Sequence, residues 1–359
     1  MGIGIGIGRR RAAGIAAGAA VLVAGACLYG ASATGSWPFR ASYCWGAWQE
    51  DSGPDFLGEK ALGKSESERR AEESAPPSAT APNATCTVTI SSSVADDDSD
   101  DPLNFDERVT LAYGPLPAAA EERRAWMAHF FDGSASPLPD GLSGLVAGDR
   151  AMLVLPEACD VSGRPSVVTL RSEGWGDGHL GKKAMPFAIG SRMDVARMLL
   201  DAADTTMAKA GCKPDKPLRS TSPMAVTAEE EDGASTPLCR IPGVTFEFGK
   251  ESTYRQRIGV VAAHLHTCSV VSRVRGVPEE PAAQFVMASE PRMATLFDGL
   301  PEGAGHGLVR ATCDGRPTVF YGNIGPGLAG RAVPGGEQVF ANFVKSVSGR
   351  IGCTAGENA

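Results

Sequence analysis

Nine cysteines constrain the fold of this 359-residue chain more than any other feature of its sequence. They are widely spread, and no two of them have the Cys-x-x-Cys spacing that zinc ribbons and redox dithiols use. Cysteines in this number and spacing favour disulfides, which persist in oxidising compartments outside the cytoplasm. The sequence therefore predicts a disulfide-bonded protein that is exported.

The N-terminal segment has the organisation of an export signal. Three arginines at 9–11 precede an uncharged stretch at 12–38, and positive charge before an apolar segment is retained on the cytoplasmic side. We predict a cytoplasmic basic tail at 1–11, a transmembrane signal anchor at 12–38 and the C-terminal bulk outside the cell membrane. Two alternatives stay open: cleavage near Ala33 would release a secreted protein, and acylation of Cys27 would make a lipoprotein.

The rest of the sequence contains an internal repeat. A Cys-Asp motif that ends in Gly-Arg-Pro occurs at 159–165 and returns, two residues shorter, at 313–317. Phe-Asp-Gly precedes both copies, at 131–133 and 297–299, and a Gly-Cys pair follows both copies. This shared order predicts a duplicated structure.

The repeat sets the predicted domain boundaries. Module 1 is expected at 39–212 and module 2 at 238–356. Residues 213–237 between them contain four prolines and an acidic run, a composition typical of a linker. Residues 59–83 are rich in Ser, Glu, Ala and Pro and are expected to form a mobile loop in module 1.

Periodicity predicts the same kinds of elements in both copies. The strand-like runs lie at 86–92, 108–113, 152–155 and 166–170, then at 244–248, 258–274, 307–311 and 318–321. Apolar residues recur at helical spacing after each set, at 193–203 and 339–347, and a further helix is expected at 118–131. The predicted fold class is α+β, with two related disulfide-stapled modules, each an antiparallel sheet with a packed C-terminal helix, after the membrane segment.

Eight cysteines divide evenly between the copies. The sets are Cys44, Cys86, Cys159 and Cys212, and Cys239, Cys268, Cys313 and Cys353. Four cysteines allow three pairings in each copy, and the sequence does not choose among them. Because Cys159 ends a predicted strand and Cys212 follows a predicted helix, their pairing would staple helix to sheet. A second staple of Cys313 with Cys353 would leave Cys44 with Cys86 and Cys239 with Cys268.

Three patterns suggest ligand chemistry but have simpler interpretations. His264, His266 and Cys268 alternate along a predicted strand as metal ligands can, but we interpret the histidines as a surface or cross-strand pair and the cysteine as bridged. The acidic run at 96–107 has EF-hand-like spacing without the glycine that the turn needs, so we expect a solvated loop. Glycines at 325–330 match Gly-x-Gly-x-x-Gly, but a proline interrupts them and we expect a loop.

No metal, cofactor or catalytic residue is therefore predicted. The Asp160–Arg164 and Asp314–Arg316 combinations in the repeated turn are interpreted as structural acid–guanidinium pairs. Patterns such as His-Glu-x-x-His and Gly-x-Ser-x-Gly are missing from the sequence. The formal net charge of -8, without a basic stripe, argues against a nucleic-acid partner.

Two aromatic and glycine-containing segments carry a resemblance. Tyr-Cys-Trp-Gly-Ala-Trp at 43–48, Gly-Pro-Asp-Phe-Leu-Gly at 53–58 and the Ala/Gly/Arg-rich leader resemble uncharacterised exported or membrane-anchored proteins of streptomycete-type actinobacteria. The resemblance implies location and no activity. The expected function is that of a membrane-anchored extracytoplasmic binding or interaction protein, with an envelope protein or cell-wall ligand as partner. A secreted or tethered cell-envelope hydrolase and a structural envelope component are the alternatives.

Overall fold

The computed structural model describes residues 41–63, 67–95, 102–176, 184–225, 231–232, 237–246, 254–260, 264–272 and 281–354. Residues Tyr43–Ala359 belong to one compact unit. The predicted tail and membrane segment at 1–38 lie outside the described residues. In the part of the chain that is described, no helix has the length and hydropathy needed to cross a membrane.

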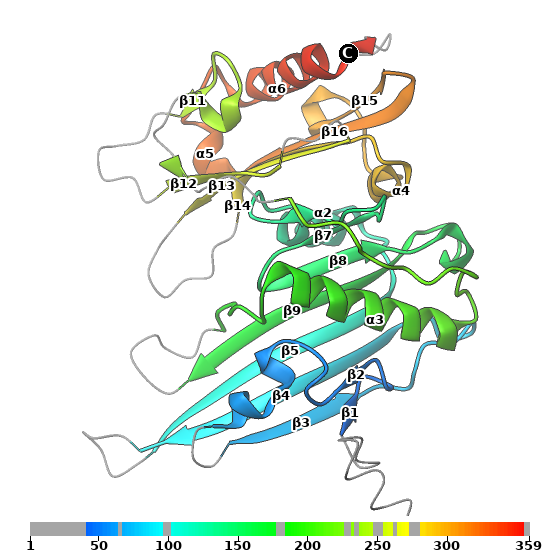
Figure 1. Ribbon diagram of the computed structural model, residues 1–359. Helices are drawn as coiled ribbons and strands as arrows, with labels where there is room; N and C mark the ends of the chain where they lie inside the picture. Colours follow the sequence, from blue (N-terminus) through cyan, green and yellow to red (C-terminus); the bar gives the residue numbers. More distant parts are fainter. Residues whose placement is uncertain are drawn as a thin grey trace, which may run out of the picture. The chain divides into compact units, whose positions relative to one another are not determined.

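The first half of the compact unit is built on a seven-stranded antiparallel sheet (Figure 1). Its strands, in spatial order, are β3 (Glu68–Glu73), β4 (Ala84–Val94), β5 (Leu103–Pro115), β9 (Ser166–Gly176), β8 (Arg150–Val154), β7 (Gly144–Val146) and β6 (Ser136–Pro137). The alternation of side chains in β5 gives the sheet two different faces. Val109 and Leu111 are fully buried on one face, whereas Thr110 and Ala112 point to the other.

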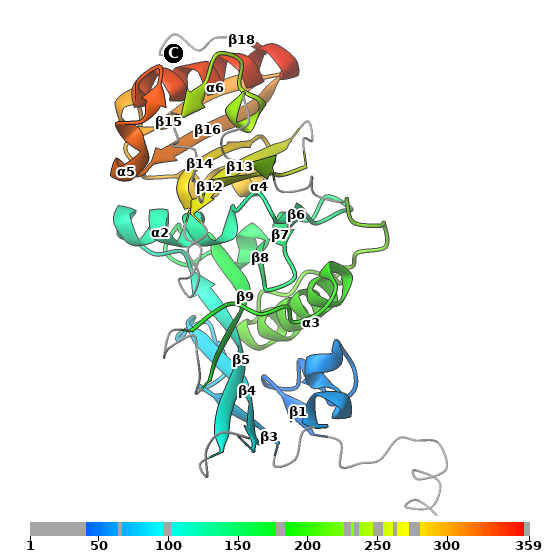
Figure 2. The same ribbon diagram turned by 90° about the vertical axis from the view of Figure 1, so that its left-hand side faces the viewer.

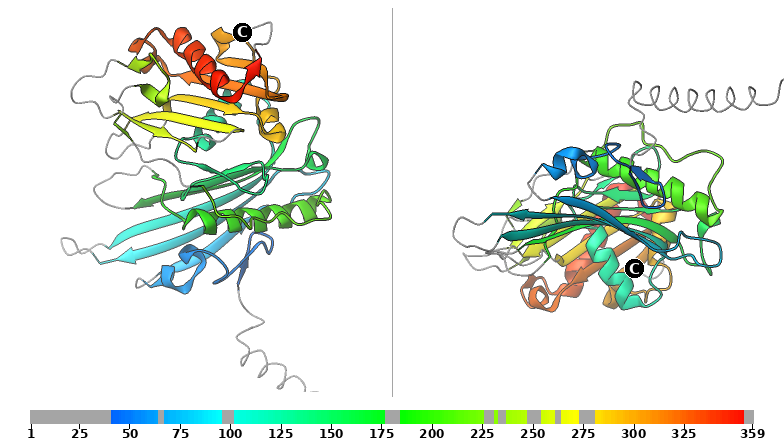
Figure 3. Two further views of the ribbon diagram at one scale, coloured as in Figure 1. Left: turned by 45° about the horizontal axis from the view of Figure 1, so that its top comes forward. Right: turned by 90° about the horizontal axis from the view of Figure 1, so that it is seen from below.

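One face of this sheet is covered by α3 (Arg192–Ala210), as Figures 2 and 3 show. The helix begins where the Ser191 hydroxyl accepts a hydrogen bond from the Asp194 amide, and it ends at Gly211, whose φ of 76° is the left-handed conformation that glycine adopts easily. Val195 and Leu199 of α3 pack into the core formed by this face of the sheet. Short elements precede β3: β1 (Ser42–Tyr43), β2 (Trp48–Gln49), η1 (Asp55–Leu57) and η2 (Glu59–Leu62).

The second half has its own seven-stranded antiparallel sheet. The strands, in spatial order, are β10 (Glu231–Asp232), β12 (Tyr254–Ile258), β13 (Leu265–Ser272), β14 (Pro281–Ala288), β16 (Arg316–Ile324), β15 (Leu308–Cys313) and β18 (Cys353–Thr354). The helix α6 (Gly336–Ile351) covers one face, where Phe340 and Phe343 pack with Phe285 of β14 (Figure 1). The connections of this half contain η4 (Leu238–Arg240), β11 (Thr245–Phe246), η6 (Ala304–His306), α5 (Pro326–Ala329) and β17 (Ala332–Val333), whereas η3 (Glu157–Cys159) follows β8 in the first half.

Besides the hydrophobic cores beneath α3 and α6, a third hydrophobic core joins the two halves. It contains residues of α2 (Ala120–Phe130), of α4 (Pro291–Ala294) and η5 (Thr295–Phe297), and of both sheets. Phe131 and Phe297, the aromatic residues of the two Phe-Asp-Gly motifs, lie here with their ring centroids 5.7 Å apart. Gly133 follows in the first motif, where a Cβ atom would lie 1.9 Å from the Arg257 carbonyl oxygen. The repeated motif therefore contributes directly to the contact between the halves.

Four disulfides are present, as predicted, and they follow the pairing that the helix-to-sheet argument favours. The pairs are Cys44–Cys86, Cys159–Cys212, Cys239–Cys268 and Cys313–Cys353. Cys159 and Cys313 are joined to the cysteines that follow α3 and α6. The Cys44–Cys86 bond attaches the segment before β3 to β4, and the Cys239–Cys268 bond attaches η4, which lies between β10 and β12, to β13. The disulfides indicate an extracytoplasmic protein, because such bonds persist in oxidising compartments.

The two halves share their strand order. Disregarding the short edge strands, β3-β4-β5-β9-β8 corresponds to β12-β13-β14-β16-β15. Each half then ends in its longest helix and a Gly-Cys pair. In the turn between the last two strands, Ser162–Gly163 and Asp314–Gly315 all have positive φ, so the glycine of each copy occupies a position that disfavours other residues.

The structure differs from the sequence predictions in several segments, and the strand β14 at 281–288 was not predicted at all. Residues 59–83, expected to be a mobile loop, contain η2 and the edge strand β3. Strand β3 pairs with β4 through its backbone while its side chains are mostly exposed, so it lacks the apolar alternation that identifies a strand. The run at 258–274 is divided between β12 and β13, and the glycine segment at 325–330, expected to be a loop, contains α5.

The predicted linker at 213–237 is described only in part. In that part, the amides of Thr221 and Ser222 donate hydrogen bonds to the Asp140 carboxylate at 2.6 and 3.0 Å. The hydrogen bonds from Ser222 and Thr221 lower the pKa of Asp140 to about 2. These contacts attach the beginning of the segment to the first half.

Candidate functional site

A hollow of about 760 Å³ lies between α2 and the face of the first sheet that α3 does not cover. We call it the α2 hollow. The residues that line it include Thr85, Thr110, Ala112, Trp126, His129, Phe130, Asp132, Arg150, Thr169 and Arg171. Figure 2 shows α2 and α3 on opposite sides of this sheet. The hollow combines an aromatic wall, a floor of small side chains and a charged end.

The wall is formed by one side of α2. Met127 and Phe130 are buried in the core shared by the two halves, while Trp126 is partly buried and lines the hollow with its ring 4.9 Å from that of Phe130. The helix is held at its first turn by Arg123, whose guanidinium donates to the carbonyls of Pro117 and Asp298. Trp126 is thus presented to the hollow by a helix fixed to both halves.

The floor consists of short side chains from neighbouring strands. Thr110 and Ala112 alternate on β5, and Thr169 and Arg171 alternate on β9, so all four lie on one face. The Thr110 hydroxyl is 3.4 Å from that of Thr87 on β4. Small residues leave space above the sheet, and the threonines add hydrogen-bonding groups to it.

The charged end contains a buried carboxylate between two arginines. Asp132 is 2% exposed, and its Oδ2 lies 3.5 Å from Arg150 and 3.2 Å from Arg257. Its other oxygen accepts a hydrogen bond of 2.7 Å from the Ser134 amide. Burial alone would raise the pKa of Asp132, but Arg150, Arg257 and Ser134 outweigh it and hold the pKa below its usual value. Asp132 is therefore ionised at neutral pH.

His129 lies beside these charges on α2. Partial desolvation, followed by the charges of Arg150 and Arg171, lowers its pKa. The side chain is exposed at the surface of the hollow, where water screens these charges. His129 is neutral at pH 7 and can donate a hydrogen bond from one ring nitrogen and accept one at the other.

The histidines and cysteine with possible metal-ligand spacing do not come together. His264 is exposed in the turn before β13, His266 is 1% exposed in the core beneath α6, and Cys268 is bonded to Cys239. Within the described residues, no group of three or more His, Cys, Asp or Glu side chains could hold a metal ion. Of the acidic run at 96–107, residues 96–101 lie outside the described residues, and residues 103–107 belong to β5 and not to a loop.

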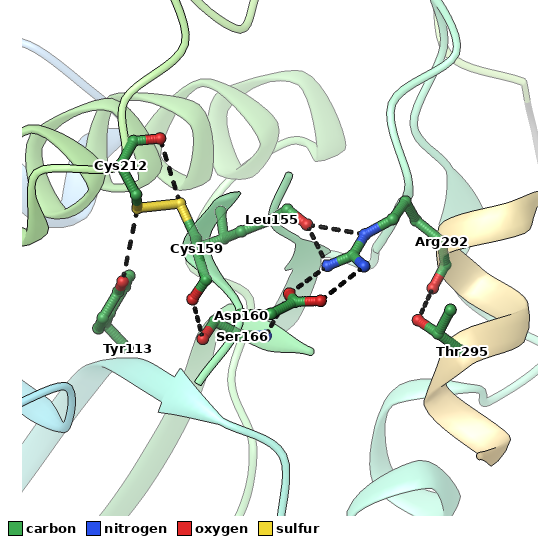
Figure 4. Close-up of polar contacts among 8 residues, drawn as sticks. All are labelled: Tyr113, Leu155, Cys159, Asp160, Ser166, Cys212, Arg292 and Thr295. Atoms are coloured by element: carbon green, nitrogen blue, oxygen red, sulfur yellow. Dashed lines mark hydrogen bonds and ion pairs between the residues drawn. A yellow bond between two sulfur atoms is a disulfide. The ribbon is translucent and has the colours of Figure 1, made fainter. Parts of the chain in front are cut away.

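The predicted Asp160–Arg164 pair is wrong. Arg164 donates instead to the Leu116 carbonyl at 2.7 Å, and Asp160 binds Arg292 of α4 with a shortest distance of 2.5 Å (Figure 4). Arg292 also donates to the Leu155 carbonyl. The true partner lies 132 residues away in the other half, so local spacing could not reveal it.

His266 makes the stability of the protein sensitive to acid. Neither ring nitrogen has a hydrogen-bond partner among the described residues, and the ring packs against Phe343. Burial, followed by the charges of Arg350 and Arg240, lowers its pKa from 6.5 to about 4. Between these pH values the unfolded state binds more protons than the folded state. The free energy of unfolding should therefore fall as the pH drops from 6.5 to about 4, by up to roughly 3 kcal/mol.

Urea titrations at pH 7 and pH 4.5 check this expectation. A His266→Leu variant should lose less stability between the two pH values than the wild type, whatever its stability at pH 7. The matched control is His264→Gln, because His264 is two residues away and exposed. Equal acid losses in all three proteins would show that His266 does not cause the effect.

The sequence had located α2 but not the hollow beside it. Trp126 and His129 fall inside the predicted helix at 118–131, yet nothing in their spacing indicates a site. No protein-family model matches the chain, and no curated protein or solved structure matches it significantly.

Proposed function

We propose that the chain is an extracytoplasmic binding protein, held at the cell membrane by residues 12–38, whose cell-wall ligand occupies the α2 hollow. The hollow carries this proposal, since small-molecule sites are concave, partly aromatic and equipped with a few polar groups. Its volume of about 760 Å³ lies within the range of roughly 300–1,000 Å³ typical of such sites. The four disulfides and the resemblance to exported actinobacterial proteins agree with the proposed location.

The proposal includes a duplicated architecture, with modules at 39–212 and 238–356. The equal strand order, the equivalent positions of the disulfides and the meeting of Phe131 with Phe297 support it. Among the described residues, only the first module has a helix as long as α2 between its third and fourth main strands. The corresponding segment of the second holds the four-residue α4 and the 3-10 elements η5 and η6. Duplication followed by divergence would thus have left the hollow in one copy.

Full-length protein prepared from its source cells provides the test. We expect it to remain in the membrane pellet after an alkaline carbonate wash, because the anchor is retained. In the detergent-solubilised, oxidised protein, mixtures of cell-wall sugars and short cell-wall peptides should shift the Trp126 indole N–H resonance. A Trp126→Phe variant assigns that resonance and keeps an aromatic wall.

The control is Trp175, which is also partly buried in the first half but stacks with Arg108 and does not line the hollow. Its resonance should not respond. A response of both resonances, or of neither, would contradict a ligand site at the hollow. Release of the full-length protein by the carbonate wash would contradict the anchor.

A further inference from the structure

Arg171 is the more open of the two arginines that line the α2 hollow. Its side chain is 52% exposed, whereas that of Arg150 is 11% exposed. Strand register places Arg171 between Thr110 on β5 and Arg150 on β8, directly opposite both. Arg171 therefore projects from the floor with a threonine on one neighbouring strand and a second arginine on the other.

Nearby carboxylates neutralise Arg150 more completely than Arg171. Arg150 has Asp149 at 2.7 Å and Asp132 at 3.5 Å. Arg171 has Glu173 at 3.6 Å, and this carboxylate is itself 36% exposed. Like charges that face each other across an antiparallel pair are destabilising, and an exposed ion pair offsets little of that cost. An anion in the hollow would complete the pairing that the chain leaves weak at Arg171.

Other groups of the hollow fit the same ligand chemistry. The hydroxyls of Thr110 and Thr169 can donate to an oxyanion from the floor, and neutral His129 can donate from the wall. The whole chain has a formal net charge of -8, so the two arginines of the floor are opposite in sign to the protein as a whole. Such local contrast attracts anions to one place on the surface.

We propose that the ligand of the α2 hollow carries a carboxylate or phosphate group that pairs with Arg171 and accepts a hydrogen bond from Thr110, while its uncharged part lies against Trp126. This inference rests on the proposed function, because it names the chemical class bound at that site. Arginine binds both anions through two parallel N–H donors, which explains why either group fits. The volume leaves room for an organic molecule that carries the anion.

Matched acidic and neutral probes test the inference on the full-length, oxidised protein in detergent. Glucuronic acid and glucose 6-phosphate are compared with glucose, and N-acetyl-phenylalanine with its amide, by titration of the Trp126 indole resonance. At least one acidic probe should bind about tenfold more tightly than its neutral counterpart. A response to carboxylates only, or to phosphates only, supports the inference and identifies the group.

Three variants separate pairing with Arg171 from general charge effects. Arg171→Gln should weaken the acidic probe about tenfold, and Arg171→Lys should weaken it less because the charge remains. Glu173→Gln should leave affinity unchanged or increase it, since it removes a competing carboxylate. The matched control is Arg197→Gln on α3, which removes the same charge from a side chain that is 57% exposed on the far face of the sheet.

Two results would overturn the inference in distinguishable ways. If neutral probes shift the Trp126 resonance as strongly as acidic ones, the hollow binds ligands but not through an anion. If Arg171→Gln and Arg197→Gln behave alike, Arg171 is not the anion's partner. If no probe of either kind shifts the resonance, the inference and the proposed function both fail.

Discussion

Replacing Asp132 with asparagine is expected to lower the free energy of unfolding by about 3–5 kcal/mol, the cost typical of breaking a buried ion pair from one side. The carboxylate is 2% exposed and lies within 3.5 Å of both Arg150 and Arg257. Asparagine has a similar shape but no charge to offset the two guanidiniums. Because Arg257 belongs to the second half, the loss should also weaken the contact between the halves.

The second Phe-Asp-Gly motif supplies the control. Asp298 pairs with Arg310 at 2.8 Å, but its side chain is 59% exposed, so Asp298→Asn should cost less than about 1 kcal/mol. Both variants remove the same charge from the same sequence motif. Urea unfolding at pH 7 under non-reducing conditions measures the difference. Equal losses of unfolding free energy in the two variants would mean that the buried cluster of Asp132, Arg150 and Arg257 stabilises the protein no more than an exposed ion pair does.

The repeat was visible in the sequence because its residues have local roles. Glycines with positive φ and cysteines after strands or helices are needed at fixed places in each half, and so their order survives. The strands with regular alternation, such as β4 and β5, were predicted for the same reason. The helix at 118–131 was also predicted, and α2 occupies 120–130.

The sequence contains no comparable pattern that would have predicted the contacts between the two halves. Strand β14 is largely buried on both faces, so its sequence does not alternate, and the edge strand β3 has almost no buried side chains. Arg292 and Arg257 belong to the second half, and both form ion pairs with carboxylates of the first half. Arg171 and Trp126 line the same hollow only because α2 folds back over the sheet. Such pairings depend on the assembled fold and cannot be deduced from spacing.

Removing the Cys159–Cys212 disulfide is expected to reduce the free energy of unfolding by about 4 kcal/mol. The bond closes a separation of 53 residues, and a crosslink of that length restricts the unfolded chain by roughly this amount. It also joins the segment after α3 to η3, which is followed directly by Asp160, the partner of Arg292 (Figure 4). The paired variant Cys159→Ala/Cys212→Ala avoids leaving a reactive thiol.

The Cys239–Cys268 bond gives the comparison, because it closes only 29 residues and its chain-entropy contribution should be smaller by about 0.5 kcal/mol. A larger difference would show that the Cys159–Cys212 bond also stabilises the folded state. The Asp160–Arg292 ion pair is the contact through which we expect it to do so. In that case Arg292→Gln should cost less in the Cys159→Ala/Cys212→Ala background than in the wild type. Unchanged unfolding of both double variants would contradict the view that the Cys159–Cys212 bond, between the end of α3 and the sheet, and the Cys239–Cys268 bond, between η4 and β13, stabilise the fold.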